Sequence, residues 1–250
     1  MTNGRKRFEA AVRRGKLKVP EIGFHEAAII VNGEVPPQLA NAEFRDRLLR
    51  SAPSLTGWPP FVELGSGNSL SEPPYVLDDG WEALIDILPP KPPILAHSLD
   101  FWRIEPRGFF YHLRGLEDDL NESRGVTPGR QLNFSWQIER TAEMISTGLS
   151  FARSLGCAEA TASLIFGFRW SKLRGRVLYS SGHGLLRAAS VSHQDGYASP
   201  PVVVPLETPI TSVVPYVERA LQGLFAIFGG AQLPTQVVEE IVRGTMRRRH

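Results

Sequence analysis

Cysteine is nearly absent from the sequence, and this scarcity excludes two ways of holding a fold together. Cys157 is the only cysteine among the 250 residues. A disulfide within the chain needs two thiols, and the zinc and iron–sulfur sites that are built on cysteine need several, so neither can form within one chain. Because this thiol stands in the apolar stretch FARSLGCAEA, we expect it to be a small buried side chain.

Long hydrophobic runs and an excess of one charge are also missing. No apolar segment reaches the roughly 20 residues that cross a bilayer, and the basic start of the chain lacks the apolar core of a secretory signal. The 28 Lys and Arg residues nearly balance the 26 Asp and Glu residues, which leaves a net charge of +2. We therefore expect a cytoplasmic protein without a membrane partner, and the net charge gives no reason to expect a polyanionic one.

The sequence has no self-sufficient catalytic, metal-binding or phosphate-binding motif. The six histidines are scattered, no HExxH pattern is present, and no Gly-rich loop stands between a strand and a helix. We therefore predict no metal site, no cofactor and no catalytic residue. One alternative stays open, because Ser181, His183 and Asp195 are close in sequence and could form a hydrolytic triad, although no Gly-x-Ser-x-Gly elbow surrounds the serine.

The distribution of apolar residues predicts an α+β fold, with an antiparallel sheet and helices packed on one face. Helical spacing occurs in segments 5–16, 40–49, 139–156, about 208–228 and 235–247. Strand-like patterns occupy residues 27–31, 81–88, 131–138, 160–181 and 200–207, and the fourth of these reads as two strands that turn near residues 171–175.

Proline and glycine are concentrated between residues 51 and 93, where we expect an irregular segment because proline lacks the amide donor that helices need. The domain organisation that follows is a basic N-terminal segment, residues 1–20, and an α+β module, residues 21–250. The module could divide into two subdomains, residues 21–95 and 96–250.

The clearest single motif is a β-hairpin over residues 99–119. Apolar residues flank the turn sequence Pro106-Arg107-Gly108, in which proline presets the bend and glycine has no Cβ to clash. Side chains before the turn alternate as in a half-exposed strand. We expect Trp102 and Arg103 to be exposed there and to contact a partner.

A basic segment, GFRWSKLRGR, is the second candidate surface. Arg169, Lys172, Arg174 and Arg176 surround Trp170. Arginine binds phosphates and an exposed tryptophan can stack on a base, so these five residues are the predicted nucleic-acid site. The alternative is a solvated hairpin tip whose tryptophan faces the core, and the nearly neutral net charge favours that alternative.

Several phrases of the sequence together resemble a known family. They are LTGWPP, DDGWEALI, LDFWRIEPRGFFYHLRGLEDD, FRWSKLRGRVL and a C-terminal helix that contains Leu-Pro. In this order they resemble the C-terminal region of bacterial proteins that begin with a Schlafen AlbA-type DNA-binding or ATP-binding domain. The resemblance covers about residues 20–247. The N-terminal patterns of that domain are absent, so it implies the companion module alone and transfers no functional residue.

From these observations we expect a non-catalytic binding or regulatory module of a nucleic-acid-linked bacterial protein. Its partner would be another protein or a second copy of the chain. Direct nucleic-acid binding through the basic segment and hydrolysis by an unrecognised triad are the two alternatives.

Overall fold

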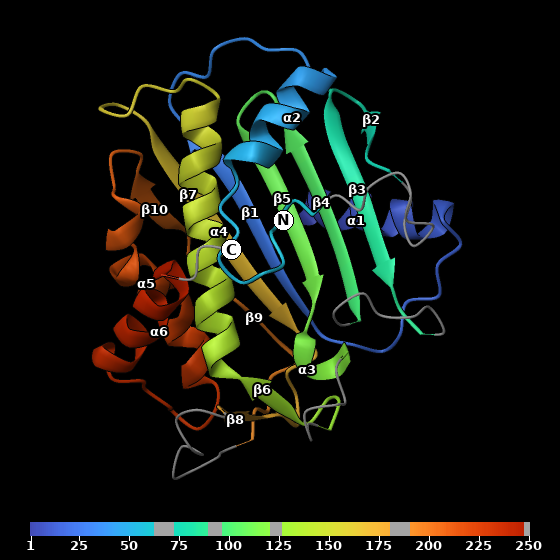
Figure 1. The fold of residues 1–250 in the computed structure, drawn as a ribbon. Helices are drawn as coiled ribbons and strands as arrows, with labels where there is room; N and C mark the ends of the chain where they lie inside the picture. The colour runs from blue at the N-terminus through green and yellow to red at the C-terminus, as the bar shows by residue number, and fades with distance from the viewer. Residues whose placement is uncertain (63–72, 90–96, 121–126, 181–190, 248–250) are drawn as a thin grey trace.

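The computed structural model describes residues 1–62, 73–89, 97–120, 127–180 and 191–247. Within these residues, one large antiparallel sheet carries a layer of helices on one face and the N-terminal helix on the other (Figure 1). The predicted α+β class with an antiparallel sheet is therefore confirmed. None of the described helices is long and apolar enough to cross a membrane.

The main sheet has eight strands in the order β10-β7-β1-β5-β4-β3-β2, and β9 pairs with β7 as well. Neighbouring strands are antiparallel throughout. β1 therefore lies in the middle of the sheet, between strands that follow it much later in the chain. The bounds of the strands are β1 Phe24–Asn32, β2 Tyr75–Leu77, β3 Gly80–Ile87, β4 Ser98–Glu105, β5 Phe109–Gly115, β7 Ser163–Ser171, β9 Gly196–Ala198 and β10 Val202–Pro205.

The helix layer is built around α4 (Phe134–Ser154), which crosses the sheet in front of β1 and β7 (Figure 1). Its first turn is capped by Asn133, whose side chain accepts a hydrogen bond from the Ser135 amide. Gly148 brings α4 close to the sheet, because a Cβ there would stand 2.6 Å from the Phe166 ring. Three more helices pack beside α4: α2 (Ala42–Ser51), α5 (Val214–Ala226), which follows the short 3-10 turn Ile210–Ser212, and α6 (Thr235–Arg247).

Helix α1 (Thr2–Arg14) lies on the opposite face of the sheet, behind β3 and β4 in Figure 1. Phe8 packs edge-to-face on Phe24 and Phe101, with ring centroids 5.7 and 6.0 Å apart. Gly4 lies directly against the Tyr111 ring. The apolar stripe of α1 was predicted from the sequence. That this helix packs on the face opposite the other helices was not predicted.

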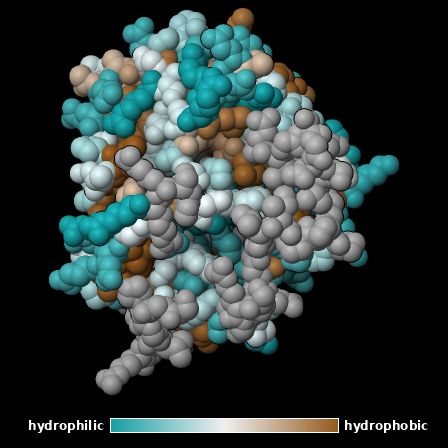
Figure 2. Space-filling view, in the orientation of Figure 1, coloured by the Kyte–Doolittle hydropathy of each residue, from teal (hydrophilic) through white to brown (hydrophobic). Residues whose placement is uncertain are grey.

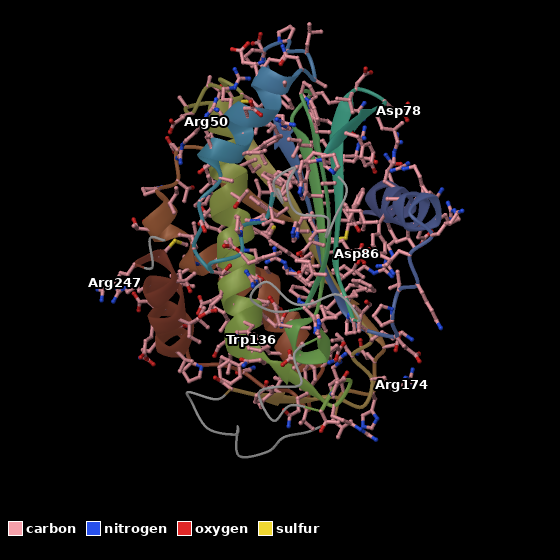
Figure 3. The ribbon with its side chains drawn as sticks, turned by 45° about the vertical axis from the view of Figure 1, so that its right-hand side comes forward. Arg50, Asp78, Asp86, Trp136, Arg174 and Arg247 are labelled. Atoms are coloured by element: carbon pink, nitrogen blue, oxygen red, sulfur yellow. The ribbon has the colours of Figure 1, made fainter. Side chains whose placement is uncertain are left out.

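The basic residues of α1 bind carboxylates of the sheet and of the β2–β3 turn. Arg5 lies 3.4 Å from the buried Glu26, and Arg7 lies 2.7 Å from Asp78 and 3.8 Å from the buried Glu82. In Figure 3 Asp78 stands at this turn, on the side of the sheet where α1 lies. The basic N-terminal segment is therefore a docked helix whose guanidinium groups cover acidic positions of the sheet.

Most predicted elements are present, with three differences. The strand predicted over residues 131–138 ends at Asn133, and residues 134–138 form the first turns of α4 instead. Residues 177–179 form β8 (Val177–Tyr179), which pairs in parallel with β6 (Gln131–Asn133) in a separate two-stranded sheet, so the predicted hairpin around residues 171–175 is wrong. The helix expected to begin near residue 208 begins at Val214. Within the predicted irregular segment, the described part contains two paired strands, β2 and β3.

The two proposed subdomains share one sheet. β3 pairs with β4, and β1 pairs with both β5 and β7, so β1 from residues 21–95 lies between strands from residues 96–250. At the lower end of the sheet, the one-turn helix α3 (Glu117–Leu120) carries Asp119, which binds the Gly23 amide at 2.6 Å. The first and second halves of the chain are thus joined by hydrogen bonds both within the sheet and beside it.

Candidate functional site

The predicted nucleic-acid site does not form one exposed surface. Trp170 is fully buried on the α4 side of the sheet, where its Nε1 donates to Gln137 at 2.9 Å. Arg176 is also buried, and its guanidinium binds both carboxylate oxygens of Asp119, at 2.9 and 2.6 Å. Expecting Trp170 to be available for stacking and Arg176 for phosphate binding is therefore wrong, because both side chains are occupied inside the protein.

The three remaining basic residues of that segment are exposed, and two of them already face carboxylates. Lys172 Nζ lies 3.0 Å from Glu21, and Arg169 Nε lies 3.9 Å from Glu26. Arg174 stands at the lower end of the molecule, as Figure 3 shows. Nucleic-acid binding through these three residues stays a prediction, without the aromatic contact that motivated it.

The predicted partner contact on β4 is likewise in the interior. Trp102 is fully buried and its Nε1 donates to the Val62 carbonyl at 2.9 Å. Arg103 is 2 % exposed and binds Glu82 at 2.7 Å and Glu105 at 2.6 Å. The β2–β3 turn covers Arg103 on one face of β4, and Phe61 and Val62 cover Trp102 on the other, so the expectation that Trp102 and Arg103 meet a partner is wrong.

The hydrolase alternative has no support from the described residues. Ser181 and His183 lie outside them, so their approach to Asp195 is not described. Cys157 is buried, as expected, and burial raises the pKa of its thiol, which disfavours the nucleophilic thiolate.

A row of buried polar side chains crosses three strands of the sheet, and the register of these strands brings the side chains together. His25 pairs with Arg114 across β1 and β5, and Arg114 pairs with Asp100 across β5 and β4. Residues that pair in register point to the same face of a sheet, so all three side chains stand on the face that α4 covers. Arg114 Nε donates to Asp100 Oδ1 at 2.5 Å.

Residues 55–62, which we call the strap, lie between the sheet and α4. Side chains of the buried row and of α4 form hydrogen bonds to the strap. Trp58 Nε1 donates to Asp100 Oδ2 at 2.7 Å. From α4, Glu143 accepts the amides of Leu55 and Thr56 at 3.2 and 3.1 Å. Arg140 lies 3.1 Å from Glu143 and completes the ion pairs. The arrangement explains why a Pro-rich segment is ordered here: charged groups from two layers satisfy its backbone.

The two histidines of this region are neutral. Burial, reinforced by Arg114 and Arg140, lowers the pKa of His25 to about 3, and burial followed by Arg114 lowers the pKa of His112 well below its usual value. His112 Nε2 lies 3.9 Å from Asp100 Oδ1, beyond hydrogen-bond reach. His25, Asp100, His112 and Arg114 are at most 3 % exposed. Among the described residues no three His, Cys, Asp or Glu side chains could hold a metal ion. The row therefore positions the strap and the sheet.

The uncovered part of the opposite sheet face carries a different feature, an apolar row. Val203 of β10 pairs with Ile165 of β7, Ile165 pairs with Ile30 of β1, and Ile30 pairs with Phe109 of β5. Ile30 is 52 % and Val203 46 % exposed, and the other two are half-buried. We call these four residues the open-face row. Gly167, one row further, adds no side chain, and the Met1 side chain lies beside it, because a Cβ at position 167 would stand 3.6 Å from Met1 Cε.

Cationic groups border the open-face row. Arg107 at the β4–β5 turn is 77 % exposed, and Arg169, on the same face of β7, is 49 % exposed. The carboxylates that they approach, Glu105 and Glu26, are buried. What this face presents to solvent is therefore apolar in the middle and positive at its edges.

The open-face row was not predicted, although the sequence contains a signal for it. Residues 27–31 of β1 and 202–204 of β10 are apolar at successive positions, without the alternation of a strand that has one wet face. Such runs indicate strands that are covered on both faces. Among the described helices, none packs over the second face of β10 or of the end of β1.

Comparison with models of protein families, with curated proteins and with solved structures gives no match to this chain. The Schlafen AlbA-associated family therefore stays a prediction.

Proposed function

We propose that this chain is a binding module that docks another protein on the open-face row. The observation that carries the proposal is that Val203, Ile165 and Ile30 stand side by side across three strands, with two of the three about half exposed. Burying such side chains contributes about 25 cal/mol per Å² of apolar surface removed from water. Solvated faces of antiparallel sheets normally carry polar residues instead.

Charge favours a heterologous partner over a second copy. Two copies that met through this face would bring their Arg107 and Arg169 groups together, and like charges placed opposite each other oppose association. A partner with apolar side chains at its centre and carboxylates at its edge complements the surface. The association rate with such a partner would fall as salt is raised.

The test uses a photo-crosslinking residue at position 30 of the full chain, in the cells that produce it. Position 39 is the matched control, because Leu39 is an apolar residue that is 78 % exposed in a loop away from the row. The expected result is a crosslink to one protein from position 30 and not from position 39. The purified partner should then bind Ile30→Asp at least about tenfold more weakly than the unmodified chain, and Leu39→Asp within about twofold.

Three other outcomes would contradict the proposal. Crosslinks between two copies of the chain would indicate self-association, crosslinks to nucleic acid would favour the basic-segment hypothesis, and equal crosslinking from both positions would show no preference for the row. Circular dichroism of both variants checks that each folds.

A further inference from the structure

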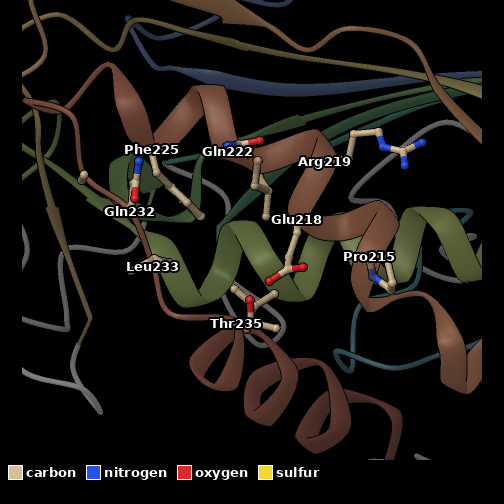
Figure 4. Close-up of a pocket in the computed structure, with 11 residues that line it drawn as sticks. Pro215, Glu218, Arg219, Gln222, Phe225, Gln232, Leu233 and Thr235 are labelled. Atoms are coloured by element: carbon tan, nitrogen blue, oxygen red, sulfur yellow. The ribbon is translucent and has the colours of Figure 1, made fainter.

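The helix layer contains a groove that is separate from the open-face row. It lies between α5, the segment that follows α5, and the first turns of α6, and has a volume of about 410 Å³ (Figure 4). That volume falls within the range of small-molecule pockets. In Figure 2 apolar residues appear between hydrophilic ones over these helices.

The apolar part of the lining is made by core residues of both helices. Leu221 and Phe225 come from α5 and Val238 from α6, and all three are buried in the main core. Leu233, from the connecting segment, is half-buried. These side chains are held by packing on α4 and each other, so this wall is pre-formed.

The polar part of the lining is one carboxylate, one guanidinium, two amides and a hydroxyl. Glu218 lines the groove together with Gln222, Gln232 and Thr235. In Figure 4 the Glu218 side chain points across the groove towards Thr235. In the part of the chain that the structure describes, no hydrogen bond or ion pair involves these four side chains. Arg219 also lines the groove; in Figure 4 its side chain points away from Glu218, and its Cζ lies 6.0 Å from the Tyr216 ring centroid.

On the side of the groove where Glu218 faces Thr235, away from Arg219, the charge is therefore set by Glu218. The start of α6 contributes a positive partial charge of about half a unit, which is smaller than the full negative charge of the carboxylate. A cation that enters the groove would meet a carboxylate without a counter-ion, with amide oxygens from Gln222 and Gln232 nearby.

We propose that this groove binds an organic cation: a protonated amine or guanidinium group attached to a compact apolar body. The cationic group pairs with the Glu218 carboxylate, and the apolar body packs on Phe225, Leu233 and Val238. Both a free amine and the side chain of a lysine or arginine in a peptide have this chemistry.

The experiment measures binding to the full chain by isothermal titration calorimetry and by amide chemical shifts. The probes are phenethylammonium as the free amine, acetyl-Leu-Lys-Leu-amide as the peptide, 2-phenylethanol as the uncharged analogue and phenylacetate as the anion. We expect a cationic probe to bind with shifts at residues 218–235. 2-Phenylethanol should bind at least tenfold more weakly, and phenylacetate more weakly still. Whichever cationic probe binds more tightly identifies the source.

Glu218→Gln should weaken binding of the cationic probe at least tenfold, because it removes the charge and keeps the shape. The matched control is Glu240→Gln, an exposed carboxylate on α6 that does not line the groove. It should change affinity less than twofold. Equal binding of amine and alcohol, preferential binding of phenylacetate, equal effects of the two substitutions, or no binding by either cationic probe would each overturn the proposal. None of these outcomes bears on the open-face row, which lies on the opposite face of the sheet.

Discussion

At the scale of single residues, buried histidines couple the stability of the fold to pH. The pKa of His25 is lowered from 6.5 to about 3 in the folded chain, and that of His112 is lowered in the same direction. Below pH 6.5, and down to about pH 3 for His25, these two histidines therefore bind more protons in the unfolded chain than in the folded chain, so at them acid favours unfolding. Asp118, whose pKa burial raises to about 7, binds its proton more readily in the folded chain and offsets part of this effect. Arg114 and Arg140, which face these rings, keep their charge over this range and add to the effect, whereas the Asp100 carboxylate opposes it at His112.

We expect the free energy of unfolding to fall as pH is lowered from 6.5 towards 3, by up to about 1.4 kcal/mol per pH unit for each histidine. Urea titrations at half-unit intervals between pH 7 and pH 4 measure this slope. His112→Leu removes one titrating group and should reduce the slope. If the slope is unchanged in that variant, protonation of His112 does not contribute to the pH dependence of the free energy of unfolding.

Arg176 and Arg174 provide a second prediction, because they stand two positions apart in different surroundings. Arg176 is buried against Asp119, and Arg174 is exposed. Removing one member of a buried ion pair leaves the other charge without compensation, which costs about 3–5 kcal/mol. Arg176→Ala should therefore lower the free energy of unfolding by that amount, and Arg174→Ala should change it by less than about 0.5 kcal/mol. Equal effects in a denaturant titration would contradict the assignment of Arg176 to the interior.

At the scale of secondary-structure elements, the place of α1 on the sheet depends on a single glycine. A Cβ on Gly4 would overlap the ring of Tyr111. That ring cannot easily move, because it is fully buried and its hydroxyl donates to Glu26 at 2.6 Å. The helix can lie on the sheet only because position 4 has no side chain.

Gly4→Ala should therefore lift the start of α1 from the sheet, although alanine favours a helix by about 1 kcal/mol. Hydrogen exchange of residues 5–14 should become faster, and the free energy of unfolding should fall. Gly244→Ala in α6 is the matched control, because a Cβ there meets nothing within 4 Å. It should stabilise the protein by about 0.5–1 kcal/mol. If both substitutions stabilise, the contact of Gly4 with Tyr111 is not close enough to matter.

The elements that local patterns could predict are those whose own residues determine them. Helix α6 matches residues 235–247 because its apolar residues recur at helical spacing. The β4–β5 hairpin follows from Pro106-Arg107-Gly108, and Gly108 has the positive φ of 84° that such a turn requires. The pairing of β8 with β6, in contrast, depends on contacts between residues far apart in sequence, such as Arg176 with Asp119, which no local pattern reports.

The candidate sites were harder to predict than the fold for a related reason. Basic and aromatic residues suggested a surface, but Trp102, Trp170 and Arg176 find partners inside the protein. The exposed features, Ile30 and Val203, look in the sequence like ordinary core residues of strands. Whether an apolar side chain is covered depends on which elements pack over it, and that is a property of the assembled molecule.

At the scale of the whole molecule, the topology predicts a single cooperative unit. β1 is the central strand, and its partners β5 and β7 lie beyond residue 96. β3 pairs with β2 on one side and with β4 on the other. Within residues 1–95 only the pairing of β3 with β2 remains. A boundary near residue 95 therefore separates strands that hydrogen-bond to each other.

We expect the fragments 1–95 and 96–250 not to fold alone, and to recover the spectrum of the intact chain when they are mixed. Residues 1–95 retain β1 without either neighbour, and an isolated strand in water does not compensate the conformational entropy of ordering it. Dispersion of amide resonances in each fragment and in the mixture measures this, and the intact chain should melt in one transition. A folded spectrum from either fragment alone would favour two subdomains. Reconstitution would show that the pairings of β1 with β5 and β7 and of β3 with β4 hold the two fragments together, because these are the strand pairings that the cut separates.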